Sequence, residues 1–245
     1  MQQFIRKKIT FFIFFTLSWL YLNTSVIFSQ SISGSELLKK SMEFHDPQNH
    51  WSKKKVSFSF LETRPDGSQR KTNLKINPVK NFVEIRQKKE GHEIIYSINA
   101  DEANILLDGR RFFSENDRDT FGLTQERALI LRNYYTYLYG LPMKLKDPGT
   151  NINPEVIETK FQDQPVYALK VTYDPKVGAD TWYFYFAKNN FQLTGYRFFH
   201  DEAKGDGEYI ILDKLITIAG MNLPQIRKWY TNQDDKFLGT DKIVQ

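Results

Sequence analysis

Short segments in which apolar and polar residues alternate make up most of the chain, with the two-residue period of a β-strand. Residues 56–60, VSFSF, put Val56, Phe58 and Phe60 on one face. Turn signals such as RPDG at residues 64–67 separate these segments. The pattern predicts strands at residues 56–60, 69–76, 79–86, 92–98, 103–107, 156–161, 166–173, 181–187, 191–199, 209–218, 223–230 and 237–243. About eleven or twelve short strands joined by hairpin-sized turns predict one antiparallel sheet that curves into a half-barrel.

Residues 124–141, TQERALILRNYYTYLYGL, carry the one long helical pattern of the chain. On a helical wheel its apolar residues fill an arc of roughly 200°, about twice the stripe that a helix lying on a flat sheet needs. Thr124 is the expected N-cap, and Gly140 followed by Pro142 is a stop signal. The four tyrosines of this segment require water or hydrogen-bond partners for their hydroxyls. We therefore expect the helix to lie in a concave sheet, as its plug or lid.

A shorter amphipathic helix is predicted at residues 35–44 and is followed by the sequence FHDPQNHW. His45, Asp46 and His50 in this sequence are the only His/Asp group with the spacing of metal ligands. They are weak candidates, because a catalytic zinc site needs three ligands held in place and the two histidines straddle a proline turn. In the other interpretation these side chains satisfy backbone groups at a helix-ending turn, and Trp51 packs on the sheet edge.

Residues 1–29 have the three parts of a secretory signal peptide: a basic start, an apolar stretch and a more polar end. Cleavage is expected between Ser29 and Gln30, and cleavage after Ser31 is the alternative. An uncleaved N-terminal anchor is the competing interpretation, because residues 9–28 reach the ~20 residues that span a bilayer. The polar residues within that stretch favour cleavage. We therefore expect export of a domain that begins at residue 30 and runs to residue 245.

Composition removes several functional classes. The chain has no cysteine, which excludes disulfides, thiolate catalysis, cysteine zinc sites and cysteine-linked lipid anchors. Its net charge is +5, but Arg6, Lys7 and Lys8 belong to the predicted signal. Without these three of its 34 basic residues, the chain has 31 basic against 29 acidic residues. The only basic cluster is at residues 53–55 and no nucleic-acid motif accompanies it, so no nucleic-acid partner is expected.

Motifs of covalent and nucleotide chemistry are missing from the sequence. It contains no GxSxG turn between a strand and a helix, and its GDG at residues 205–207 lies between predicted strands rather than before a helix. Paired acidic residues occur in turn-like segments, where solvation is sufficient explanation for them. No cofactor is expected.

The strand at residues 181–187, TWYFYFA, is aromatic on both faces. Trp182, Phe184 and Phe186 share one face, and tyrosines occupy the other. A sheet with one face in water would show polar residues in one of these rows. Both faces are therefore expected to contact apolar or amphipathic groups, either as ordinary core or as the wall of a ligand cavity.

The order of these elements resembles that of the periplasmic outer-membrane lipoprotein carrier and its relatives, a LolA/LppX-like fold. More locally, FHDPQNHW and the tail ITIAGMNLPQIRKWY…FLGTDKI at residues 216–243 resemble a family of exported bacterial domains of unknown function. The resemblance implies an unclosed, strongly curved antiparallel sheet covered by helices around an apolar cavity that takes acyl chains. None of the carrier's functional residues can be placed on this chain.

We expect a mainly β (α+β) domain, with two helices on the concave side of one curved sheet. The expected function is non-enzymatic binding of a lipid, a lipoprotein acyl chain or another apolar ligand between the central helix and the sheet. The expected lining is Leu131, Tyr135, Leu138, Trp182, Phe184 and Phe186. We expect a periplasmic monomer that could meet the outer membrane and a membrane-associated donor or acceptor protein. The alternatives are a metal- or carboxylate-dependent hydrolase that uses His45, Asp46 or His50, and a structural or adaptor protein with a filled interior.

Overall fold

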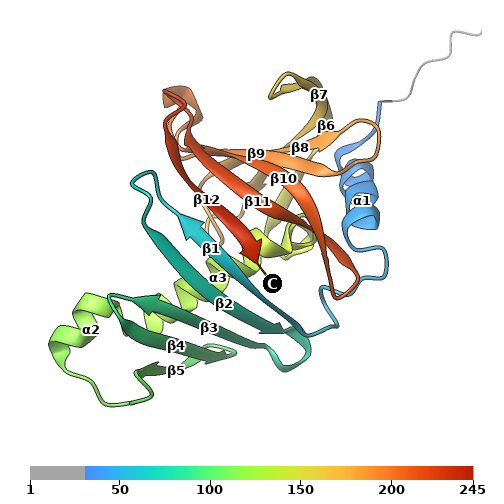
Figure 1. Ribbon diagram of the computed structural model, residues 1–245. Coiled ribbons are helices and arrows are strands. Elements are labelled where there is room, and N and C mark those ends of the chain that lie inside the picture. The colour runs from blue at the N-terminus through green and yellow to red at the C-terminus, as the bar shows by residue number, and fades with distance from the viewer. Residues whose placement is uncertain (1–30, 245) are drawn as a thin grey trace, which may run out of the picture. The chain divides into compact units, whose positions relative to one another are not determined.

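A computed structural model describes residues 31–244, so the predicted signal segment, residues 1–29, lies outside the described residues. The described residues form one antiparallel sheet of twelve strands in the order β5-β4-β3-β2-β1-β12-β11-β10-β9-β8-β7-β6 (Figure 1). The strands are β1 (Val56–Thr63), β2 (Gln69–Asn77), β3 (Phe82–Lys89), β4 (His92–Asn99), β5 (Glu102–Leu107), β6 (Thr150–Phe161), β7 (Gln164–Tyr173), β8 (Thr181–Ala187), β9 (Leu193–Phe199), β10 (Glu208–Ile218), β11 (Met221–Thr231) and β12 (Phe237–Val244). The predicted open, curved antiparallel sheet is confirmed.

Two chain segments build the sheet, and each is a meander in which consecutive strands pair. The first contains β1–β5 and the second contains β6–β12. They meet where β1 pairs with β12, for example at Phe60 opposite Ile243. In Figure 1 this seam is the contact between the cyan strand β1 and the red strand β12. Strands β5 and β6 form the two edges, so the sheet stays open.

Three α-helices accompany the sheet in the described residues: α1 (Gly34–His45), α2 (Glu115–Phe121) and α3 (Gln125–Gly140). Short 3-10 helices lie at Pro78–Lys80, Met143–Lys146 and Glu202–Lys204. The Thr124 hydroxyl accepts the N–H of Arg127 and so caps α3 as predicted. The sheet curves around α3, while α1 lies beside β6 and β11 (Figure 1). None of the helices in residues 31–244 is long and apolar enough to cross a membrane.

The main core lies between α1, α3 and one face of the sheet. Leu37 of α1, Leu131 of α3 and Phe60 of β1 belong to the same buried cluster. A second, smaller cluster lies on the opposite face, where Tyr185 stacks on Phe161 with 4.2 Å between the ring centroids. These two clusters explain why residues 181–187 are aromatic on both faces, because alternate side chains of one strand enter different clusters.

The structure differs from the sequence-based expectation at two elements. Helix α2 was not predicted, because none of its residues is buried and no apolar period marks it. Its signal is a capping box, in which the Ser114 hydroxyl accepts the Asp117 N–H and the Asp117 carboxylate accepts from Ser114. Strand β6 begins at Thr150 rather than at residue 156, since the register shift between Ile152 and Val156 accommodates an Asn-Pro segment that had suggested a loop.

Candidate functional site

A groove with a volume of about 730 Å³ lies between α3 and the ends of strands β7–β10, and we call it the aromatic groove. Its size is within the range of small-molecule sites. Its lining combines aromatic rings with polar and charged side chains: Asn133, Tyr134, Thr136, Tyr137, Leu138, Lys144, Asp147, Tyr173, Val177, Gly178, Asp180, Trp182, Phe198, His200, Glu208 and Trp229. The groove can therefore contact both apolar and polar parts of a ligand.

Helix spacing and strand pairing bring this lining together. Tyr134, Tyr137 and Leu138 lie three and four residues apart, so they share one face of α3. Trp182 and Phe198 are directly opposite each other on β8 and β9, and their stacked rings are 4.8 Å apart. Tyr137 therefore contacts Trp182 of the sheet, whereas Ile130 and Tyr134, in the same apolar arc, keep 49% and 44% of their surface exposed.

Two tyrosines join α3 to the groove wall. The Tyr137 and Tyr173 hydroxyls hydrogen-bond to each other, and the two rings meet edge to face at 6.3 Å. Burial raises the pKa of Tyr173 to about 12, which keeps the hydroxyl protonated at neutral pH. Inside the core, the Tyr135 hydroxyl accepts a hydrogen bond of 2.8 Å from Gln87. Tyr135 and Tyr137 therefore have the expected hydroxyl partners, whereas the buried Tyr139 hydroxyl has none within the described residues.

The residues expected to line a cavity divide into two sets. Leu138 and Trp182 line the aromatic groove. Leu131, Tyr135, Phe184 and Phe186 lie in the packed core, with at most 6% of each side chain exposed. Four of the six residues expected to line a cavity therefore belong to the filled core, and two reach the groove.

Sequence reasoning did not single out Tyr137, Tyr173, Phe198 or Trp229 as groove residues. Tyr137 belongs to the apolar arc of the predicted helix, which was the available signal. The other three come from strands β7, β9 and β11, which lie far apart in sequence. Only the order of the strands in the sheet brings them to one place.

A smaller hollow of about 280 Å³, which we call the acidic arm, shares Tyr134, Glu208 and Trp229 with the aromatic groove. Its remaining lining is Glu62, Thr63, Arg64, Leu238, Gly239, Thr240 and Asp241. The Asp241 carboxylate accepts a hydrogen bond of 2.9 Å from the Trp229 indole N–H. Burial, reinforced by the charge of Glu62, raises the pKa of Asp241 to about 6. The arm is therefore a neighbouring polar hollow, with the carboxylates Glu62, Glu208 and Asp241 and the cation Arg64 in its lining.

The weak metal candidates are bonded to the backbone. His45 Nδ1 lies 2.5 Å from the Asn222 carbonyl oxygen, and its Nε2 accepts the N–H of Leu193. The Asp46 carboxylate accepts the backbone N–H groups of His50 and Trp51.

The second histidine, His50, places Nδ1 2.8 Å from the Ala219 carbonyl oxygen. These contacts fasten the end of α1 and the following turn to strands β9–β11. Within residues 31–244 no three His, Cys, Asp or Glu side chains are placed to hold a metal ion.

The sequence matches the model of a family of unknown function, DUF6503, over residues 7–245, and the chain belongs to this family. No curated protein matches it significantly. Among solved structures, it is similar to a LolA superfamily protein from Nitrosomonas europaea, with a TM-score of 0.50 and 11% identity over 88% of this chain and 93% of that one. It is also similar to a DUF1329 family protein from Desulfovibrio piger, with a TM-score of 0.50 and 9% identity over 88% and 92% of the two chains. At these identities the likeness concerns the fold.

Proposed function

We propose that this protein is a non-enzymatic carrier or binding protein for a lipid, a lipoprotein acyl chain or another apolar ligand. The observation that supports this proposal is the aromatic groove, a hollow of about 730 Å³ at the place where α3 meets the curved sheet. The fold shared with a LolA superfamily protein agrees with a carrier role.

The chemistry of the groove suits an acyl chain. The His200 ring, which is bonded to Asp180, lies edge to face with Phe198 at 5.4 Å, and Trp182, Phe198 and Trp229 supply apolar ring surface. Each methylene transferred from water to such a surface contributes about 0.8 kcal/mol. A chain of about ten methylenes therefore supplies about 8 kcal/mol before the costs of ordering, which is sufficient for binding without covalent chemistry.

The proposed carrier role requires a place where apolar ligands are exchanged and a protein that delivers or accepts them. The protein is exported to the periplasm, where it meets a membrane-associated donor or acceptor of the apolar ligand. Val177 on the groove rim has 58% of its surface exposed, so a ligand can enter without unfolding of the core. The protein acts as a monomer in this proposal.

Native mass spectrometry of the purified protein, followed by organic extraction, tests the proposal. We expect an apolar ligand to co-purify or to bind after incubation with lipids. Val177→Asp places a charge on the groove rim and should reduce the bound fraction at least tenfold. Val79→Asp is the matched control, because Val79 is 74% exposed and lies outside the groove. An apo mass that lipids and detergents leave unchanged would refute the carrier function.

A structural or adaptor role is the second candidate, and the filled part of the interior favours it. Phe184 and Phe186 have no exposed surface, and Leu131 is almost as buried. A protein in which the groove is merely a surface irregularity would show no ligand and no difference between the Val177 and Val79 variants. The same experiment therefore separates the two functions.

A further inference from the structure

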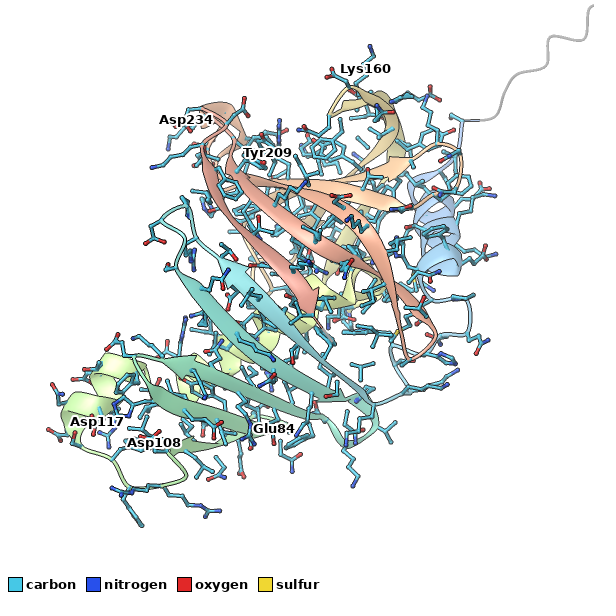
Figure 2. The ribbon with its side chains drawn as sticks, viewed as in Figure 1. Glu84, Asp108, Asp117, Lys160, Tyr209 and Asp234 are labelled. Atoms are coloured by element: carbon cyan, nitrogen blue, oxygen red, sulfur yellow. The ribbon has the colours of Figure 1, made fainter. Side chains whose placement is uncertain are left out.

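A second hollow of about 630 Å³, which we call the hairpin hollow, lies at the opposite ends of β7, β8 and β9 from the aromatic groove. Residues of the β6–β7 hairpin, of the turn between β8 and β9, and of β10 line it. Lys160 in Figure 2 marks the tip of this β6–β7 hairpin. The hollow shares no lining residue with the aromatic groove and is large enough for a small molecule.

The apolar part of this lining is held firmly in place. Phe161 stacks on Tyr185 with 4.2 Å between the ring centroids. The Phe161 ring also lies against Gly195, where a Cβ would come within 2.2 Å of it, so only glycine allows this approach. Val166 and Ile211 add further apolar surface to the hollow. The hairpin hollow therefore offers fixed apolar surface to a ligand.

Five carboxamide side chains share the hollow with these apolar residues: Gln162, Gln164, Asn189, Asn190 and Gln192. Asn190 accepts the backbone N–H of Gln192 through its side-chain oxygen and so shapes the turn between β8 and β9. The other four side-chain amides have no protein hydrogen-bond partner in the part of the chain that the structure describes, residues 31–244. Each of them presents an acceptor oxygen and an NH₂ donor. The amides are therefore available to a ligand.

The hollow has no uncompensated charge in its lining. None of the described residues that line it is an Asp or a Glu. Its one charged side chain, Lys188, forms an ion pair with Glu158 and lies 5.2 Å over the Tyr167 ring. A charged ligand would therefore find no free counter-charge there, which favours a neutral polar ligand.

We propose that the hairpin hollow is a second binding site, which takes a neutral saccharide. A sugar ring has an apolar face of C–H groups that matches Phe161, Val166 and Ile211. Its hydroxyls each donate and accept hydrogen bonds, so one carboxamide can donate to a hydroxyl and accept from the next one. A purely apolar ligand would leave the amides unpaired. The site goes beyond the proposed carrier function and does not depend on it.

Heteronuclear NMR of the isotope-labelled protein tests this proposal, because the side-chain NH₂ groups of Asn and Gln give their own signals. The probes are maltotriose, cellotriose and chitotriose, each titrated to about 20 mM, and an uncharged peptide, N-acetyl-trialanine amide. We expect at least one trisaccharide to shift the NH₂ signals of Gln164, Asn189 and Gln192, with a dissociation constant of about 1 mM. The peptide should leave these signals in place.

Gln164→Ala and Asn189→Ala change exposed side chains and should each weaken binding of that trisaccharide at least fivefold. Asn104→Ala is the matched control, because Asn104 is an exposed carboxamide on β5 outside the hollow, and it should leave the affinity unchanged. The saccharide site is refuted if no trisaccharide shifts these signals, if the peptide shifts them as strongly, or if both hollow variants keep the full affinity. Each of these results would leave the carrier function of the aromatic groove standing.

Discussion

The backbone N–H of Leu193 donates a hydrogen bond of 2.9 Å to Nε2 of His45, and 148 positions separate the two residues. Because Nε2 accepts, Nδ1 carries the ring proton and donates it to the Asn222 carbonyl oxygen at 2.5 Å. The neutral imidazole thus joins the end of α1 to β9 and β11 at once. Protonation would remove the acceptor that Leu193 needs.

This geometry predicts an acid-sensitive contribution to stability. Burial lowers the pKa of His45 from 6.5 to about 4. Between these two values the unfolded chain binds the proton and the folded protein does not, so stability falls as the pH falls from 6.5 to 4. The shift corresponds to about 3 kcal/mol, which is fully present above pH 6.5. Urea unfolding across this pH range measures it.

The decisive comparison is with His45→Asn, which should be less stable at pH 7.5 and should lose most of this pH dependence. Asp241 acts in the opposite direction, since its raised pKa favours folding as the pH falls through 6, so the difference between variants isolates His45. His200→Asn changes an exposed histidine and is the control. If the free energy of unfolding of His45→Asn varied with pH as it does in the unmodified protein, His45 would not be the source of the acid sensitivity.

The alternation of apolar and polar residues was the pattern that predicted most of the strands of the sheet. Segments such as residues 56–60 alternate because one face enters the core, so their position along the chain can be predicted from the sequence. Helix α2 has no buried residue, and therefore no pattern that a packing argument could detect. The Asn-Pro segment before Val156 is accommodated by an irregular register, which depends on the partner strand β7.

The site was readable only in part. The apolar arc of the central helix indicated correctly that α3 would meet apolar surface on a broad front, and Leu138 lies on that front. Whether a given position faces a filled or a hollow region depends on the curvature of the sheet, which no local pattern encodes. Phe184 and Trp182 show this, because they share one strand face and yet only Trp182 reaches the groove.

Replacing Gly140, the last residue of α3, by alanine is predicted to destabilise the protein. A Cβ at this position would lie 2.4 Å from the Trp51 indole and 2.5 Å from the Lys144 side chain. Crowding of this kind costs about 1–3 kcal/mol and exceeds the helix propensity of up to about 1 kcal/mol that alanine contributes. We expect Gly140→Ala to lose about 1–2 kcal/mol in urea unfolding.

A double-mutant cycle identifies the cause. In a Trp51→Ala background the effect of Gly140→Ala should shrink or reverse, because the indole is gone. Gly178→Ala should be nearly neutral, since its nearest neighbour is the Tyr173 ring at 3.8 Å. Equal losses at Gly140 and Gly178 would argue against the crowding account.

Arg227 of β11 is predicted to be a major stabilising residue. It is 1% exposed, lies 4.1 Å over the Tyr139 ring, and donates to the carbonyl oxygens of Leu138 and Pro224. Arg227→Met leaves these buried acceptors unpaired and should destabilise the protein by about 2–4 kcal/mol in thermal or urea unfolding.

Two variants serve as comparisons for Arg227→Met. Arg227→Lys keeps the charge but loses the planar fork, so an intermediate loss is expected. Lys160→Met changes an exposed charge at the tip of the β6–β7 hairpin, labelled in Figure 2, and should have little effect. A neutral Arg227→Met would show that Leu138 and Pro224 do not depend on this side chain.

The ion pair between Glu62 and Arg70 is predicted to contribute far more to the free energy of unfolding than the surface ion pairs do. The Glu62 side chain is 11% exposed and Arg70 donates to both of its oxygens. Arg70→Met leaves the carboxylate buried without its cation and should cost about 3 kcal/mol. Lys39→Met in the exposed pair with Glu43 should cost less than about 0.5 kcal/mol. Similar losses in both variants would contradict this ranking, which chemical denaturation measures directly.

The seam between β1 and β12 has a consequence for how the chain can be divided. Every other strand pairing joins neighbours in sequence, so residues 31–148 and 149–244 each contain one whole meander. The first fragment also carries α1 and α3, whose apolar faces are completed by the second. A cut at Pro148-Gly149 should therefore yield two fragments that reassemble when mixed, because β1 and β12 can pair again along their edges. Such fragments would form a split reporter of ligand binding.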